Sequence, residues 1–148
     1  MKHINALIVL VLMSTSLLLS ACGAGAVPLE EETGPVTLEP IPGTDLNRLT
    51  LTEKAAERLG VETVLVRAQQ VNGMERMVVP YAALLYDPSG QAWVYVNVEP
   101  LVFVREPITV AFINGDEAIL SKGPETGAAV VTLGATELFG SESEFEEE

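Results

Sequence analysis

The sequence predicts a mainly β protein, a small antiparallel β-barrel or roll with one short helix. Short runs rich in β-branched and aromatic residues recur along the chain, and turn-forming pairs separate them, as at Asn72-Gly73 and Asn114-Gly115. Only one short segment has both the spacing and the end signals of a helix. Short strands at regular spacing are typical of small antiparallel barrels and rolls. The 148 residues suit a single domain.

The first residues stand apart from this domain. Residues 6–19 form an apolar run that three hydroxyl residues interrupt, which is too short for a comfortable membrane span. The run ends in Leu19-Ser20-Ala21-Cys22, which resembles the lipobox of bacterial lipoproteins. The resemblance implies a signal peptide over residues 1–21, a diacylglyceryl group on Cys22, and a membrane-anchored protein of the cell envelope that faces the periplasm or the cell exterior. The alternative is an ordinary secretory signal in which the cysteine occurs by chance.

Both ends of the mature chain have the composition of unstructured segments. Residues 22–35 are rich in Gly, Pro and Glu, which predicts a flexible tether after the lipidated cysteine. The three glutamates within it fit a solvated spacer better than a metal site, because unstructured carboxylates bind cations weakly. Residues 141–148 are predicted to be a disordered acidic tail, which serves solubility, docking to a basic partner or weak cation binding. The β-domain is expected over residues 36–140.

Local signals predict the elements of this domain. Thr52 as an N-cap and Gly60 as a left-handed C-cap indicate the helix over residues 51–60. Pro107 has no N–H to donate and therefore predicts a sheet edge or a bulge. Strands are expected over residues 36–41, 61–68, 77–80, 101–105, 108–113, 116–121 and 128–133.

The central element is a predicted β-hairpin over residues 79–98. Its Asp87-Pro88-Ser89-Gly90 tetrad suits a type I turn, because Asp bonds the turn backbone, Pro presets φ and Gly closes the turn. The hairpin contains the only tryptophan, Trp93, together with tyrosines, so we expect it to form the core with Trp93 buried. A ligand-stacking role is the alternative for these aromatic residues. The second strand should place Ala92, Val94, Val96 and Val98 on one face, and Trp93, Tyr95 and Asn97 on the other.

The residue content argues against catalysis. The single histidine, His3, lies in the expected signal peptide, and the single cysteine is the expected lipidation site. Catalytic pairs built on His or Cys and zinc sites therefore lack their usual residues. Glycine-rich phosphate loops are also missing from the sequence. Carboxylates are abundant, but Asp45, Asp87 and Asp116 are typical of turns. We expect no enzyme, no metal and no cofactor.

The formal net charge of −13 argues against partners that carry many negative charges. Nucleic acid is not expected, because its phosphates attract Lys and Arg. A polybasic contact with lipid headgroups is excluded for the same reason. Attachment to a membrane would therefore depend on the acyl anchor, which holds a protein best when two signals combine.

Three stretches share an order and spacing with a known family. These are residues 51–63, the pair Val79-Pro80-Tyr81-Ala82-Ala83-Leu84 and Ala92-Trp93-Val94-Tyr95-Val96, and the segments 105–110, 115–116 and 127–134. Together they resemble the membrane-proximal part of the periplasmic adaptor subunits (membrane fusion proteins) of RND-type efflux pumps. The resemblance implies an all-β domain whose partner is an inner-membrane transporter subunit. The long α-hairpin and the lipoyl-like halves of complete adaptors have no counterpart in the sequence, which contains no long helical period.

Two functions follow as hypotheses. The first is a lipid-anchored accessory protein that acts by protein contact in transmembrane export. The alternative is a free-standing envelope lipoprotein that binds a small ligand or a cation. The candidate partner surface is Val102, Val104 and Thr109, because residues 101–112 carry apolar side chains on both faces and the core needs only one. A deep pocket with converging polar groups would favour the ligand binder, and an open strand edge would favour the contact protein.

Overall fold

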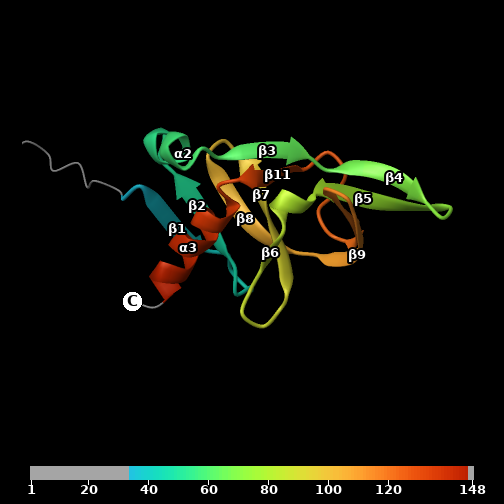
Figure 1. Cartoon of the computed structure of the whole chain (residues 1–148). Helices are drawn as coiled ribbons and strands as arrows, with labels where there is room; N and C mark the ends of the chain where they lie inside the picture. The colour runs from blue at the N-terminus through green and yellow to red at the C-terminus, as the bar shows by residue number, and fades with distance from the viewer. Residues whose placement is uncertain (1–33, 147–148) are drawn as a thin grey trace, which may run out of the picture. The chain divides into compact units, whose positions relative to one another are not determined.

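A computed structural model of the chain describes residues 34–146 and confirms a mainly β protein (Figure 1). The strands form one sheet of seven strands and one of four, and all their pairings are antiparallel. The two sheets do not close into a barrel within residues 34–146, because the end strands of each sheet lack a partner. The elements in chain order are β1 (Val36–Pro40), β2 (Asn47–Leu51), α2 (Glu53–Leu59), β3 (Glu62–Leu65), β4 (Arg67–Val71), β5 (Met74–Pro80), η2 (Tyr81–Ala83), β6 (Leu85–Tyr86), β7 (Ala92–Glu99), β8 (Val102–Pro107), β9 (Thr109–Asn114), β10 (Glu117–Lys122), β11 (Ala129–Leu133) and α3 (Ala135–Glu146).

The strand β7 lies within the seven-stranded sheet, whose order is β1-β2-β8-β7-β11-β3, with β6 also paired to β7. Alternate side chains of β7 enter two different hydrophobic clusters. Val94 is fully buried in a cluster with residues of the four-stranded sheet, and Tyr95 is fully buried in a cluster with residues of α2 and α3. The predicted alternation along this strand is therefore confirmed for its central residues, and both of its faces are covered.

The four-stranded sheet, β4-β5-β10-β9, continues from the seven-stranded one because the chain passes between them at four points. The passages occur at Val66, at η2, at Ile108 and between β10 and β11. Val66 donates its N–H to the Ala128 carbonyl at 2.8 Å, and Ile108 donates to the Ala92 carbonyl at 3.0 Å. Both side chains are buried in the cluster shared by the sheets. Pro107, expected at an edge or a bulge, instead ends β8 where the chain changes sheets.

The predicted hairpin over residues 79–98 is only partly correct. Its turn is confirmed, because the Gly90 N–H donates to the Asp87 carbonyl at 2.9 Å. Its first arm is broken, since β5 belongs to the other sheet and only the two residues of β6 pair with β7. The physical reason is that η2 turns the chain out of β5, with the Leu84 N–H donating to the Tyr81 carbonyl at 3.1 Å, and Ala83 in this turn packs beside Val79 in the cluster between the sheets.

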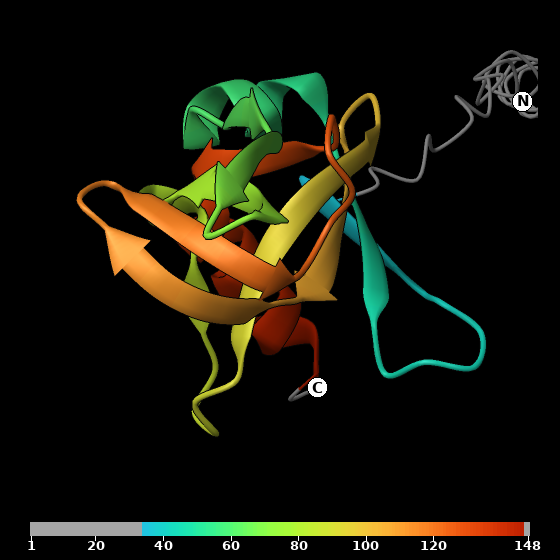
Figure 2. The same cartoon turned by 90° about the vertical axis from the view of Figure 1, so that its right-hand side faces the viewer.

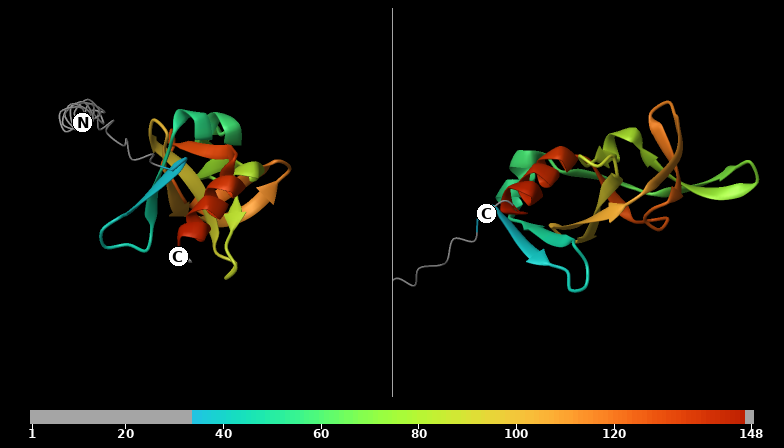
Figure 3. Two further views of the ribbon diagram at one scale, coloured as in Figure 1. Left: turned by 90° about the vertical axis from the view of Figure 1, so that its left-hand side faces the viewer. Right: turned by 90° about the horizontal axis from the view of Figure 1, so that it is seen from below.

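The helix α2 forms as its end signals predict. Thr52 accepts a hydrogen bond from the Ala55 N–H through its side chain, and Gly60 adopts the left-handed conformation at the other end with φ of 62°. α2 and α3 lie at the opposite end of the domain from the turn between β4 and β5 (Figures 1 and 3).

The expected disordered tail is corrected for residues 141–146, which belong to α3. This second helix begins after Gly134 and packs on the seven-stranded sheet, with Leu138 fully buried. Gly134 has φ of 84°, and a Cβ there would lie 3.1 Å from a methyl group of Val61, so the turn before α3 requires glycine. The reason for the correction is that Ala135, Leu138 and Glu142 recur at helical spacing and reach buried positions. The remaining residues 147–148 lie outside the described part.

Candidate functional site

The predicted partner surface does not exist as one face. Val102 is buried and Val104 half-buried, so packing covers most of this face. The edges of β8 are also occupied, because it pairs with β2 on one side and with β7 on the other, and only Thr109, on β9, is exposed. The expectation of an available face at Val102 and Val104 is therefore corrected. The expected lipidation site, Cys22, lies outside the described residues, as do the signal peptide over 1–21 and most of the tether.

Open strand edges occur elsewhere in the described part of the chain. β9 ends the four-stranded sheet, and Phe112 and Ile113 on it are 44% and 43% exposed. Figure 2 shows β9 as the outer strand of the β9–β10 hairpin. β4 ends the same sheet on the other side, with mainly polar side chains, and β3 ends the seven-stranded sheet. Unpaired edges of this kind are the usual sites of strand addition.

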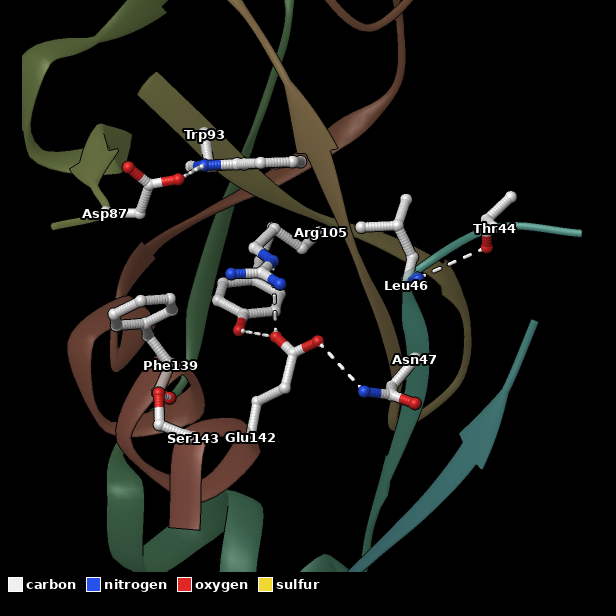
Figure 4. Close-up of polar contacts among 10 residues, drawn as sticks. Thr44, Leu46, Asn47, Asp87, Trp93, Arg105, Phe139, Glu142 and Ser143 are labelled. Carbon is white, nitrogen blue, oxygen red and sulfur yellow. Dashed lines mark hydrogen bonds and ion pairs between the residues drawn. The ribbon is translucent and has the colours of Figure 1, made fainter. Parts of the chain in front are cut away.

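A buried polar network joins α3 to the sheet (Figure 4). Glu142 is only 1% exposed, and its carboxylate accepts a hydrogen bond from the Tyr95 hydroxyl at 2.5 Å. The Asn47 side-chain amide donates to the other carboxylate oxygen at the longer distance of 3.5 Å. The Arg105 Nε lies 3.5 Å from Glu142 Oε2, an ion pair rather than a hydrogen bond. These groups come from β2, β7, β8 and α3, so the network fixes the helix against three strands.

Arg105 is held between two aromatic rings. Its guanidinium carbon lies 4.6 Å from the Trp93 ring centroid and 5.4 Å from the Phe139 ring centroid. These are distances at which a cation is attracted to the face of a ring. The side chain is 12% exposed, and its buried Nε makes no hydrogen bond within the described structure. No hydrogen bond joins its two terminal nitrogens to any residue of the described part either. The two rings therefore hold the guanidinium in place, while its N–H groups make no hydrogen bond within the described structure.

Asp87 stands beside the same tryptophan. Its Oδ2 accepts a hydrogen bond from the Trp93 indole N–H at 3.0 Å, and its Oδ1 accepts bonds from the Ser89 hydroxyl, the Ser89 N–H and the Gln91 N–H. The bond from the Ser89 hydroxyl, followed by that from Trp93, lowers the pKa of Asp87 from 3.8 to about 2. The loop is thus held by an ionised carboxylate at every physiological pH.

A pocket of about 410 Å³ lies between Asp87 and Phe139. The turn residues 87–89 form one wall, Phe139 and Ser143 of α3 form the other, and Arg105 and Glu142 also line it. In Figure 4 Trp93 lies above the Arg105 guanidinium and Glu142 below it. Asp87 and Phe139 both lie to the left of the guanidinium in this view. The volume is in the range of small-molecule sites in proteins. A second pocket, of about 230 Å³, lies between Val36, α2 and Ser141.

The sequence alone did not indicate the pocket beside Arg105. Trp93 was expected in the core, but its ring is half-buried and rests on Arg105. Asp87 was assigned to the turn, which is correct, and its bond to Trp93 was missed. Glu142 was assigned to a disordered tail, although the spacing of Ala135, Leu138 and Glu142 is a helical signal.

Within residues 34–146 no group of three or more His, Cys, Asp or Glu side chains is arranged to hold a metal ion. No helix of that part is long and apolar enough to cross a membrane. Comparisons of the chain with protein-family models, with curated proteins and with solved structures found no match.

Proposed function

We propose that this chain is a lipid-anchored accessory protein of the cell envelope that acts by protein contact in transmembrane export, with an inner-membrane transporter subunit as its partner. Two sequence features support the proposal, the lipobox-like motif that ends at Cys22 and the resemblance to efflux-pump periplasmic adaptors. The observation that carries the contact role is the open, apolar edge of β9.

The strand β9 is suited to pair with a strand of another protein. Its six residues include no proline and no charged side chain, which are the common means of protecting an edge. Register shifts in the β9–β10 ladder lie toward Thr109, whereas residues 112–114 pair regularly with β10. That regular half leaves its outward backbone groups in strand geometry, with Phe112 and Ile113 exposed beside them. Backbone hydrogen bonds would supply affinity and the two side chains specificity.

Charge favours a basic surface around the partner's strand. The chain carries a formal net charge of −13, so a positively charged partner would be steered toward it and an acidic one repelled. The opposite edge, β4, carries Arg67, Gln69 and Gln70, and offers less apolar area than β9. β9 is therefore the edge at which we place the contact.

Photocrosslinking in native membranes tests this contact. A photoreactive residue at Phe112 or Ile113 should form adducts with a transporter subunit, whereas the same residue at Gln69 on β4 serves as a matched, exposed control. Ile113→Lys should abolish the adducts from position 112, because a lysine on the edge opposes strand addition. Adducts of equal strength from Gln69, or none from β9, would contradict the proposal.

The anchor has its own test. Mass spectrometry of the membrane-bound protein should show cleavage before Cys22 and a diacylglyceryl adduct on its thiol. Cys22→Ser should release the protein from the membrane. Recovery of membrane-bound protein with an unmodified Cys22 would exclude the lipoprotein assignment.

A second candidate function, binding of a small ligand by a free-standing envelope lipoprotein, is favoured by the pocket beside Arg105. Converging polar groups with an unused cation are a feature of ligand sites. Saturable binding of a small molecule to the purified chain, in the absence of any protein partner, tests this second function, and crosslinking at β9 tests the first.

A further inference from the structure

The pocket lined by residues 87–89, Arg105 and Phe139 has the chemistry of a binding site that contact at β9 does not use. We infer that it binds a free amino acid, with the ligand carboxylate on the Arg105 guanidinium and the ligand ammonium group on the side of Asp87. The inference is independent of the proposed contact, because it depends on β7, β8 and α3 and not on β9.

Arg105 selects a carboxylate. A guanidinium presents its N–H donors in a rigid planar fork that matches the two oxygens of a carboxylate. Packing between Trp93 and Phe139 holds this fork in one place, so little side-chain freedom is lost when a ligand binds. Glu142 contacts only the Nε edge, at 3.5 Å, and Arg105 makes no hydrogen bond elsewhere in the described structure. The terminal nitrogens therefore remain for an anion.

The surrounding charge argues against a purely anionic ligand. Glu142 already compensates part of the Arg105 charge, and Asp87 adds a second carboxylate to the pocket wall. A phosphate or a dicarboxylate would be repelled by these groups and by the net charge of −13. A cationic group on the ligand removes this conflict. Asp87 Oδ2 accepts one bond, from Trp93, and has capacity for a further donor.

Size and polarity complete the match. A pocket of about 410 Å³ accommodates a single amino acid with water around it, and the ring of Phe139 together with Pro88 provides apolar walls for a side chain. The arrangement of one cation, one anion and an apolar wall fits an α-amino acid, which carries its ammonium and carboxylate groups on the same carbon.

Calorimetric titration of the purified full-length chain tests the inference. Each of the twenty proteinogenic amino acids is added separately, to about 10 mM, which detects dissociation constants in the millimolar range. At least one should bind saturably, and the non-aromatic ones should also change the fluorescence of Trp93, the only tryptophan. The amide of that amino acid, which lacks the carboxylate, should bind at least about tenfold more weakly.

Matched variants separate binding from folding. Arg105→Gln alone would leave Glu142 buried without its cation, so the double variant Arg105→Gln with Glu142→Gln is used to remove both charges together. It should lose binding by about tenfold or more while retaining a cooperative thermal transition. Arg48→Gln, which removes an exposed arginine that pairs with Glu99 at 2.8 Å, should bind as the unaltered chain does.

Asp87→Asn tests the place of the ammonium group. It should weaken the binding of the amino acid but leave unchanged the affinity for its des-amino analogue, the carboxylic acid in which hydrogen replaces the ammonium group. Four outcomes overturn the inference: none of the twenty binds, the amide binds equally well, the double variant at Arg105 and Glu142 binds normally, or Asp87→Asn affects both ligands equally. None of these outcomes bears on crosslinking at β9, so the two proposals fail separately.

Discussion

Replacement of Glu142 by alanine should destabilise the domain markedly, although the residue lies four positions from the last described one. Its carboxylate is 1% exposed and has three partners, the Tyr95 hydroxyl at 2.5 Å, the Arg105 Nε at 3.5 Å and the Asn47 amide at 3.5 Å. Alanine removes all three contacts at once, and the space inside the network is too enclosed for the partners to regain full hydration.

The magnitude follows from the groups left behind. Loss of the hydrogen bond from the Tyr95 hydroxyl to a charged acceptor costs about 1.5–3 kcal/mol. Loss of one member of a buried ion pair costs about 3–5 kcal/mol, and we take the lower part of that range because the 12% exposed Arg105 faces a pocket that water can enter. Helix propensity returns only a few tenths of a kcal/mol. The two costs together, less the gain in helix propensity, give an expected loss of unfolding free energy of about 4–6 kcal/mol.

Urea unfolding followed by Trp93 fluorescence measures this loss, because Trp93 lies on Arg105 next to the network. Hydrogen exchange over residues 135–146 should also become faster, since the helix would be held only by its apolar side chains. Glu137→Ala, at an exposed position of the same helix, is the matched control and should change stability by no more than about 0.5 kcal/mol. If Glu142→Ala matched this control, the carboxylate would not be buried and the reasoning from the network would be refuted.

Three further predictions follow from the same geometry. The folded-state pKa of Asp87 is lowered to about 2, so its ionised form contributes stability that is full above its ordinary pKa of 3.8 and is lost as the pH falls toward 2. In thermal melts across this pH window, Asp87→Asn should lose less stability on acidification than the unaltered chain. Trp93→Ala should cost about 1–3 kcal/mol in urea unfolding followed by circular dichroism, because it removes a half-buried ring together with its stacking on Arg105 and its hydrogen bond to Asp87. This is less than the cost for a fully buried tryptophan, and a loss above about 4 kcal/mol would show that the ring is a core residue. Gly134→Ala should lower the thermal midpoint, at a cost of at least about 1–2 kcal/mol, since φ is 84° there and the new Cβ meets Val61; an unchanged midpoint would contradict the turn geometry.

The parts of the fold predicted correctly from sequence are those set by near neighbours. Thr52 and Gly60 end α2 through bonds within one turn of the helix. Asn72 and Gly73 both have positive φ in the β4–β5 hairpin, as an Asn-Gly turn requires. The second turn is displaced by one residue: Asn114 pairs with Glu117, so Gly115 and Asp116 form the loop. Such turns are read from the chain because their interactions span only a few residues.

Long-range packing decided the rest. Whether a strand is at an edge depends on which strand pairs with it, and β2 covers β8 although about fifty residues separate Arg48 from its cross-strand neighbour Val104. The two sheets share one hydrophobic cluster, which draws the chain from one sheet to the other at Val66 and Ile108 and prevents one continuous hairpin.

The candidate site is the clearest case of this division. The sequence by itself determined the Asp87 turn, because the turn depends on local bonds. The spacing of Ala135, Leu138 and Glu142 is also a local signal, but the acidic composition around it led to the wrong prediction of a disordered tail. Only the tertiary structure placed Glu142 against Tyr95 and Arg105, residues on two neighbouring strands. An acidic segment by itself remains hydrated. Glu142 can be buried in a helix here because the folded sheet supplies a hydroxyl and a guanidinium that compensate its carboxylate for the lost hydration.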